Sequence, residues 1–160
     1  MAEPHAAERG ADVRFPPPLI YVIWLLLGVV VHYAIVPAHV PVGRTIGVGA
    51  GVLIVLAGIA IGVPARIQFT RTGQSPIPWK PSPQLILKGP YTFTRNPMYV
   101  GLTIIQTGLG VAFNNLWVSL FALFALVTTH FVAVLPEERY LSETFGDSYQ
   151  TYLARVRRYL

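Results

Sequence analysis

The sequence IGVGAGVLIVLAGIAIGV, at residues 46–63, contains 18 consecutive residues without Asp, Glu, Lys or Arg. Three further apolar runs without these charges occupy residues 19–36, 98–113 and 116–135. Helical segments of about 18 to 20 residues cross the hydrocarbon core of a bilayer, which is roughly 30 Å thick. Because lipid offers the backbone no hydrogen-bond partners, each run is expected to be helical. The sequence therefore predicts an all-α, polytopic membrane protein with about four transmembrane helices.

The composition agrees with a membrane protein. Of the 160 residues, 53% are hydrophobic and 12% are charged, whereas soluble domains carry about 25% charged residues. The absence of cysteine excludes disulfides, thiolate metal sites and cysteine nucleophiles, and we expect no metal site. Residues 16–160 are predicted to form one membrane domain, and the polar residues 1–15 are expected to be disordered.

The basic residues predict the orientation of the chain. With four spans, the N-terminus, the connection at residues 64–97 and the C-terminal tail share one side of the membrane. Eleven of the twelve Lys and Arg residues lie on that side, and Arg44 lies on the other. The positive-inside rule makes the first side cytoplasmic, so both termini are expected inside. This distribution also explains the net charge of +5 without nucleic acid. Short connections and the lack of an N-terminal targeting domain favour a bacterial inner membrane.

Glycines recur along the run at residues 46–63. They resemble a phosphate-binding loop, but no strand precedes them and no acidic residue follows at the distance that dinucleotide sites require. Gly47 and Gly51, then Gly58 and Gly62, form two small-x-x-x-small pairs on roughly one helical face. Close packing against a neighbouring helix is the interpretation that we adopt.

Polar and aromatic residues are concentrated in GPYTFTRNPMYVG, at residues 89–101, at the mouth of the third apolar run. The acidic pair Glu137-Glu138 follows the fourth run, and so lies at the same membrane face. Aromatic faces, hydrogen-bond donors and carboxylates are thereby expected together, in a site that suits a small ligand with positive and negative groups.

The two remaining cytoplasmic segments are candidates for a cap over this site. The proline-rich connection at residues 64–97 is long for a simple linker, which favours a functional role. The tail divides at Gly146, and the residues after it predict a short amphipathic helix at the anionic inner leaflet. A lid over a cofactor pocket is a possible additional role of that helix.

The pattern Gly-Pro-Tyr-x-x-x-Arg-Asn-Pro-Met-Tyr-x-Gly, then a helical hairpin, Glu-Glu and Phe-Gly-x-x-Tyr-x-x-Tyr resembles the isoprenylcysteine carboxyl methyltransferases and the related phospholipid methyltransferases. The resemblance covers residues 64–160. It implies an integral membrane enzyme that binds S-adenosylmethionine at the cytoplasmic side and methylates a lipophilic substrate that arrives from the bilayer.

The resemblance also implies which residues form the site. The cofactor-binding residues would be Gln84, Leu85, Ile86, Gly89, Tyr91, Arg95, Asn96, Pro97, Met98, Tyr99, Glu137 and Glu138. Two further assignments come from the residues themselves. Glu137 and Glu138 are the catalytic candidates, because an amine acceptor must lose a proton before attack. His130, in the fourth run, is the substrate-binding candidate, because polar groups within a span are functional candidates by default. The chemistry of S-adenosylmethionine fits these side chains: aromatic faces attract its cationic groups, carboxylates pair with its ammonium, and arginine binds its carboxylate.

Two departures from the prenylcysteine pattern leave the acceptor open. The chain has Arg95-Asn96-Pro97 where that pattern has Arg-His-Pro, and residues 133–136 before the acidic pair contain no arginine. A lipid amine and a prenylcysteine-like carboxylate therefore both stay candidates. The alternatives to a methyltransferase are an NADPH-dependent membrane enzyme resembling sterol reductases and a non-catalytic structural membrane protein.

Overall fold

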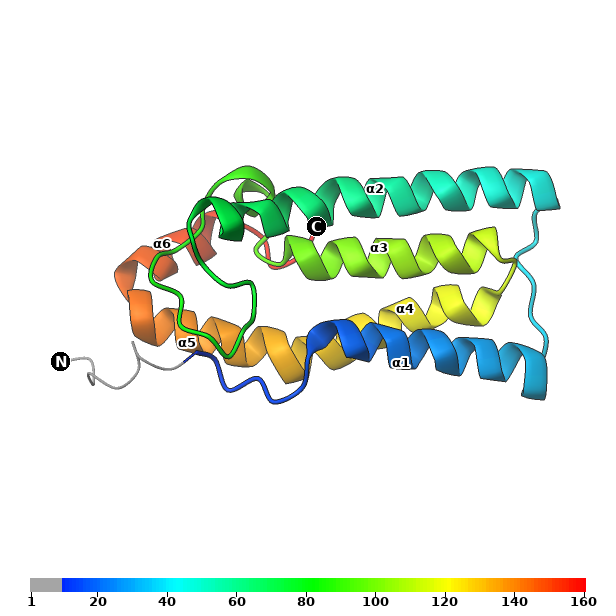
Figure 1. The fold of residues 1–160 in the computed structure, drawn as a ribbon, viewed down its shortest axis with the longest axis horizontal. Coiled ribbons are helices and arrows are strands. Elements are labelled where there is room, and N and C mark those ends of the chain that lie inside the picture. Colours follow the sequence, from blue (N-terminus) through cyan, green and yellow to red (C-terminus); the bar gives the residue numbers. More distant parts are fainter. Residues whose placement is uncertain (1–9) are drawn as a thin grey trace.

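The structure is a computed structural model that describes residues 10–160. Its long helices lie side by side in one bundle, in which α2 packs against α3 and α1 packs against α4 (Figure 1). These four helices are α1 Pro17–Val30, α2 Arg44–Arg71, α3 Pro97–Ala112 and α4 Leu116–Thr129.

Two of these helices continue through π-helical turns. Helix α1 runs on through η1, Val31–Ile35, and α4 runs on through η3, His130–Val134, into α5, Leu135–Phe145. Within residues 10–160, three continuous helices are long and apolar enough to cross a membrane: Pro17–Ile35, Arg44–Arg71 and Leu116–Phe145. The predicted all-α membrane fold is confirmed.

Helix α3, which corresponds to the third predicted span, is a shorter apolar helix than the other three. Helix α3 has 16 residues and a length of about 24 Å, less than the roughly 30 Å of a hydrocarbon core. Helix α2 has 28 residues and continues through Pro64 to Arg71, so the boundary expected at residue 64 is wrong. A proline is tolerated inside such helices because neighbouring groups satisfy the freed backbone carbonyl.

The two ends of the bundle differ in what covers them. At one end, short connections join α1 to α2 and α3 to α4. At the other end lie the segment from residue 10 to 16, the connection 72–96 with its short helix η2 (Gly89–Thr92), α5 and α6 (Asp147–Arg155) (Figure 1). These elements extend past the start of α3 and form a cap.

The terminal segments take part in this cap. Of the segment expected to be disordered, residues 1–9 lie outside the described residues, but Ala11 and Val13 are buried and the Ala11 amide donates to the Pro78 carbonyl at 2.8 Å. The predicted break at Gly146 is present, with φ +50°. The helix after it ends at Arg155, and Thr94 and Arg157 form a parallel bridge beyond that point.

Close approach through glycines joins α2 to α3. A Cβ atom added at Gly51 would lie 2.5 Å from the Ala112 backbone nitrogen, and one at Gly58 would lie 2.7 Å from the Gly101 carbonyl oxygen. At Gly49, by contrast, no atom of a neighbouring element lies within 4 Å. The interpretation of the glycine pattern as helix packing is confirmed.

Substituting Gly51→Ala should force the two helices apart, because the added methyl group meets backbone rather than a flexible side chain. We expect the free energy of unfolding to fall by about 1–3 kcal/mol, measured by thermal or denaturant unfolding in detergent micelles. Gly49→Ala is the matched control, with an expected change below about 1 kcal/mol. Equal effects of the two substitutions would contradict the packing assignment.

Candidate functional site

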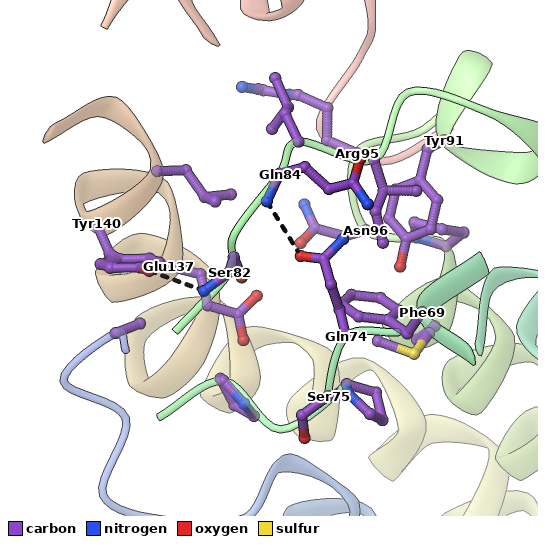
Figure 2. A pocket seen from close by; sticks show the side chains of 18 of the residues that line it. Phe69, Gln74, Ser75, Ser82, Gln84, Tyr91, Arg95, Asn96, Glu137 and Tyr140 are labelled. Atoms are coloured by element: carbon purple, nitrogen blue, oxygen red, sulfur yellow. Dashed lines mark hydrogen bonds between the residues drawn. The ribbon is translucent and has the colours of Figure 1, made fainter. Parts of the chain in front are cut away.

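A cavity lies in the cap, beyond the start of α3. Its wall comes from the end of α2, the 72–96 connection, the first turn of α3, α5 and α6. Figure 2 shows the side chains that point toward it from these separate elements. The sequence-predicted residues that line it are Gln84, Leu85, Ile86, Tyr91, Arg95, Asn96, Pro97, Met98, Tyr99 and Glu137. Three predicted residues, Gly89, Glu138 and His130, are not part of this wall.

Gly89 begins η2, at a turn of the backbone. Its φ is +62°, a conformation that side chains with a Cβ rarely adopt. An added Cβ would also lie 2.9 Å from the Gln68 Nε2 atom. The structure therefore places Gly89 where the chain turns against α2, and its neighbours Pro90 and Tyr91 are buried.

The acidic pair is divided between two environments. Glu137 lines the cavity, and its Oε1 accepts a hydrogen bond from the Tyr99 hydroxyl. Glu138 instead accepts from Arg158, through Nε at 2.9 Å and Nη2 at 2.8 Å. Arg95 Nη1 lies 3.3 Å from the same carboxylate. Adjacent residues of a helix differ by about 100° in direction, so the two carboxylates face different partners.

The C-terminal residues bind the segment that leads into α3. The Arg95 amide donates to the Arg157 carbonyl at 2.9 Å. The Arg158 carbonyl accepts from Asn96 Nδ2 at 3.0 Å and from Thr94 Oγ1 at 3.2 Å. Asn96 thus contributes to the cavity wall while its amide holds the end of the chain. Sequence reasoning did not foresee this return of the chain, because the contacts join residues more than 60 positions apart.

Arg95 carries an unused hydrogen-bond donor. Its side chain lines the cavity and is 11% exposed, with Nη1 beside Glu138. Its Nε–H is buried and has no partner among the described residues. A buried polar group without a partner costs free energy, so this donor is a candidate for binding an anionic group of a ligand.

Three tyrosines give the cavity an aromatic, uncharged wall. Tyr91, Tyr149 and Tyr152 are buried, and the Tyr152 hydroxyl donates to the Tyr91 carbonyl at 2.8 Å. Desolvation by burial raises the pKa of each phenol, that of Tyr152 to about 12. These groups therefore stay neutral near pH 7 and offer ring faces that attract cationic ligand groups.

His130, the candidate for substrate binding, does not line this cavity. It begins the π-helical turn η3, and its Nδ1 lies 2.8 Å from the Tyr159 hydroxyl, with which it shares a hydrogen bond. It therefore contacts the end of the chain rather than the cavity. The structure does not bring His130 together with the other predicted site residues.

Several lining residues were missed from the sequence. They are Ala11, Phe69, Gln74, Ser75, Pro76, Ile77, Pro78, Ser82, Tyr140, Leu141, Tyr149 and Tyr152. Tyr140 follows Glu137 by three positions and so shares its helix face, a signal that could have found it. Gln74 and Ser82 lie in an irregular connection, where spacing predicts no direction for a side chain.

The polar residues of the connection are fixed by the cavity's own side chains. The Tyr140 hydroxyl accepts from the Ser82 amide at 2.9 Å, and Gln74 Oε1 accepts from the Gln84 amide at 3.5 Å (Figure 2). Within residues 10–160, no three His, Cys, Asp or Glu side chains gather to hold a metal ion. The described cavity therefore offers aromatic faces, one carboxylate and one arginine donor to a ligand.

Comparison with known proteins gives two matches. The model of the phospholipid methyltransferase family matches residues 46–148, which is more than half of the chain. A protein-S-isoprenylcysteine O-methyltransferase of Schizosaccharomyces pombe is 38% identical over 74 residues, which are 45% of this chain and 30% of that protein. The chain thus matches less than a third of the length of this curated relative. All thirteen predicted site residues, from Gln84 to Glu138, fall inside the family match.

Replacing Tyr140→Phe should loosen the connection without removing the aromatic ring. The Ser82 amide loses its acceptor, and we expect the free energy of unfolding to fall by about 0.5–1.5 kcal/mol. Hydrogen exchange should become faster at Ser82. Tyr33→Phe is the control, because Tyr33 is 78% exposed. Unchanged exchange at Ser82 would contradict the assigned hydrogen bond.

Proposed function

The chain belongs to the phospholipid methyltransferase family, and we propose that it is a membrane enzyme that transfers a methyl group from S-adenosylmethionine to a lipophilic acceptor. The observation that carries the proposal is the cavity whose wall contains Glu137, Arg95 and several tyrosines at the end of a membrane bundle. A methyl donor with a cationic and an anionic end matches this set of groups.

The residues of the cavity fit the proposed cofactor group by group. S-adenosylmethionine carries a carboxylate, an ammonium and a sulfonium. The partnerless Arg95 Nε–H would bind the carboxylate, and Glu137 would pair with the ammonium or the sulfonium region. The neutral rings of Tyr91, Tyr149 and Tyr152 would pack against the remaining surface, including its positive part.

Methyl transfer is a displacement at carbon, for which the sulfonium supplies the activated methyl group. The chain's contribution is then to hold donor and acceptor in line and to exclude water. The buried tyrosines serve the second task. If the acceptor arrives protonated, Glu137 is the group in the wall that can accept that proton. Tyr99, which donates to Glu137 Oε1, would orient this carboxylate.

We favour a lipid amine over a prenylcysteine-like carboxylate as acceptor. Glu137 and Arg95 are the ionisable acid and base in the cavity wall, and Arg95 already lies beside Glu138. Once the cofactor carboxylate takes the Arg95 Nε–H, the wall holds no second cation for an anionic acceptor. An amine acceptor, in contrast, attacks in its neutral form and needs no cation in the wall.

The cap would face the cytoplasm, where the soluble cofactor is present. Of the Lys and Arg residues that the structure describes, Arg44 lies at the opposite end of the bundle and the others lie at the cap end. The positive-inside rule then places the cap on the cytoplasmic side. We propose a bacterial inner membrane as its location, with both termini inside.

Purified protein in detergent should bind radiolabelled S-adenosylmethionine, and Glu137→Gln should weaken this binding by roughly tenfold, a loss of about 1.4 kcal/mol. The substitution keeps the size of the side chain and removes its charge. Glu143→Gln, on the exposed side of the same helix, should bind as the wild type does. Binding of NADPH in place of S-adenosylmethionine would favour the reductase alternative, and binding of neither would refute the proposal.

Methyl transfer should be detected with lipid amines and should rise with pH until the acceptor amine is deprotonated. Glu137→Gln should lower this rate by on the order of 10²–10⁴, the usual contribution of a general base. The assay compares vesicles containing an aminophospholipid with a prenylated cysteine carboxylate as acceptors. Transfer to the carboxylate alone would contradict the choice of acceptor and leave the choice of cofactor intact.

A further inference from the structure

Helix α6 is joined to the rest of the protein in the manner of a hinged flap. At one end, Gly146 separates it from α5 with φ +50°, and an added Cβ there would have no neighbour within 4 Å. At the other end, residues 156–160 leave the helix and run beside residues 94–96. The helix between these points contributes Tyr149 and Tyr152 to the cavity wall.

The C-terminal end of the flap is held by one carboxylate, that of Glu138. Arg158 binds Glu138 through two parallel hydrogen bonds of 2.9 and 2.8 Å. Arg95, from the segment before α3, lies 3.3 Å from the same carboxylate. The side chains of Glu138 and Arg95 are only 16% and 11% exposed, so solvent screens this cluster less than a surface ion pair.

Removing the charge of Glu138 would replace its attraction to two arginines by repulsion between Arg95 and Arg158. Arg95 and Arg158 both reach the Oε1 atom of Glu138. Without the carboxylate, two guanidinium groups are left facing each other, and like charges at such separations repel. The contacts that remain at the end of the flap are neutral hydrogen bonds, such as that from Asn96 Nδ2 to the Arg158 carbonyl, which are weaker than charge-assisted bonds.

We propose that Glu138 is a positioning residue for the cofactor: it latches α6 over the cavity through Arg158 and holds Arg95 in the cavity wall. Release of this latch opens the flap about Gly146 and lets the soluble cofactor enter and leave. The inference deepens the proposed function and rests on it for the identity of the ligand. Glu138 itself touches neither cofactor nor acceptor, which separates its role from that of its neighbour Glu137.

The latch can be measured without cofactor by the reactivity of a single introduced thiol. The chain has no cysteine, so Val156→Cys provides one reporter at the junction of α6 and residues 156–160. Val156 is half-buried, and its thiol should react slowly with a maleimide. Adding Glu138→Gln or Arg158→Ala should speed labelling at least tenfold. Arg158→Lys, which keeps the charge but loses the paired hydrogen bonds, should lie between these values.

The matched control removes an arginine from the last turn of α6, three residues before Arg158. Arg155 is exposed and forms no ion pair within residues 10–160. Arg155→Ala should change labelling less than twofold. Thermal unfolding of each variant in detergent should show that the membrane bundle stays folded, which distinguishes an opened flap from a molten protein.

The second readout is the dissociation of radiolabelled S-adenosylmethionine. Glu138→Gln and Arg158→Ala should each speed dissociation at least tenfold, and added salt should speed it in the wild type more than in these variants. S-adenosylmethionine should also slow the labelling of Val156→Cys in the wild-type background.

Each outcome bears on one of the two proposals. Faster labelling in the latch variants, with no cofactor binding even by the wild type, would refute the proposed function and leave the latch supported. Normal cofactor binding, with labelling and dissociation in Glu138→Gln equal to those in Arg155→Ala, would refute the latch and leave the proposed function supported.

Discussion

The backbone contact between α2 and α3 is the constraint on which the rest of the structure depends. Glycines let the two helices meet without side chains between them, as at Gly51 beside Ala112 and Gly58 beside Gly101. Such contacts leave no freedom for α3 to slide along α2. The start of α3 at Pro97 is therefore fixed in depth, well short of the end of α2 at Arg71 (Figure 1). The missing length of α3 creates the space that the cap encloses.

The backbone of the cap is irregular, so its amides and carbonyls need hydrogen-bond partners in this space. Side chains of the site supply some of these partners. The Ser82 amide bonds to Tyr140, and the Tyr91 carbonyl bonds to Tyr152. Both tyrosines also line the cavity. Tyr140 and Tyr152 thus both line the cavity and hold the backbone of the cap, so a substitution at either position also alters the fold of the cap.

Hydropathy was sufficient to predict the helical membrane fold, because the length of an apolar run in lipid leaves little choice of structure. The motif was sufficient to identify the family and to name ten of the 22 lining residues. It did not separate Glu137 from Glu138, since the partner of Glu138 is Arg158, on a tail whose return no local pattern encodes. His130 was assigned because it is a polar residue within an apolar run, and its partner Tyr159 belongs to the same returning tail.

The charges of the site form a pattern that constrains what can bind there. Glu138 lies between two arginines and is compensated within the protein. Glu137 has no ion-pair partner within residues 10–160, and the Arg95 Nε–H has no acceptor there. A purely cationic ligand would pair with Glu137 and leave the Arg95 Nε–H without an acceptor. A purely anionic ligand would bind the Arg95 Nε–H and leave Glu137 without a cation. Since an unpaired polar group in a buried site costs free energy, a ligand that carries both charges gains from both contacts. The amino acid end of S-adenosylmethionine carries both charges. Glu137 can bind its ammonium because Glu138, rather than Glu137, pairs with the two arginines.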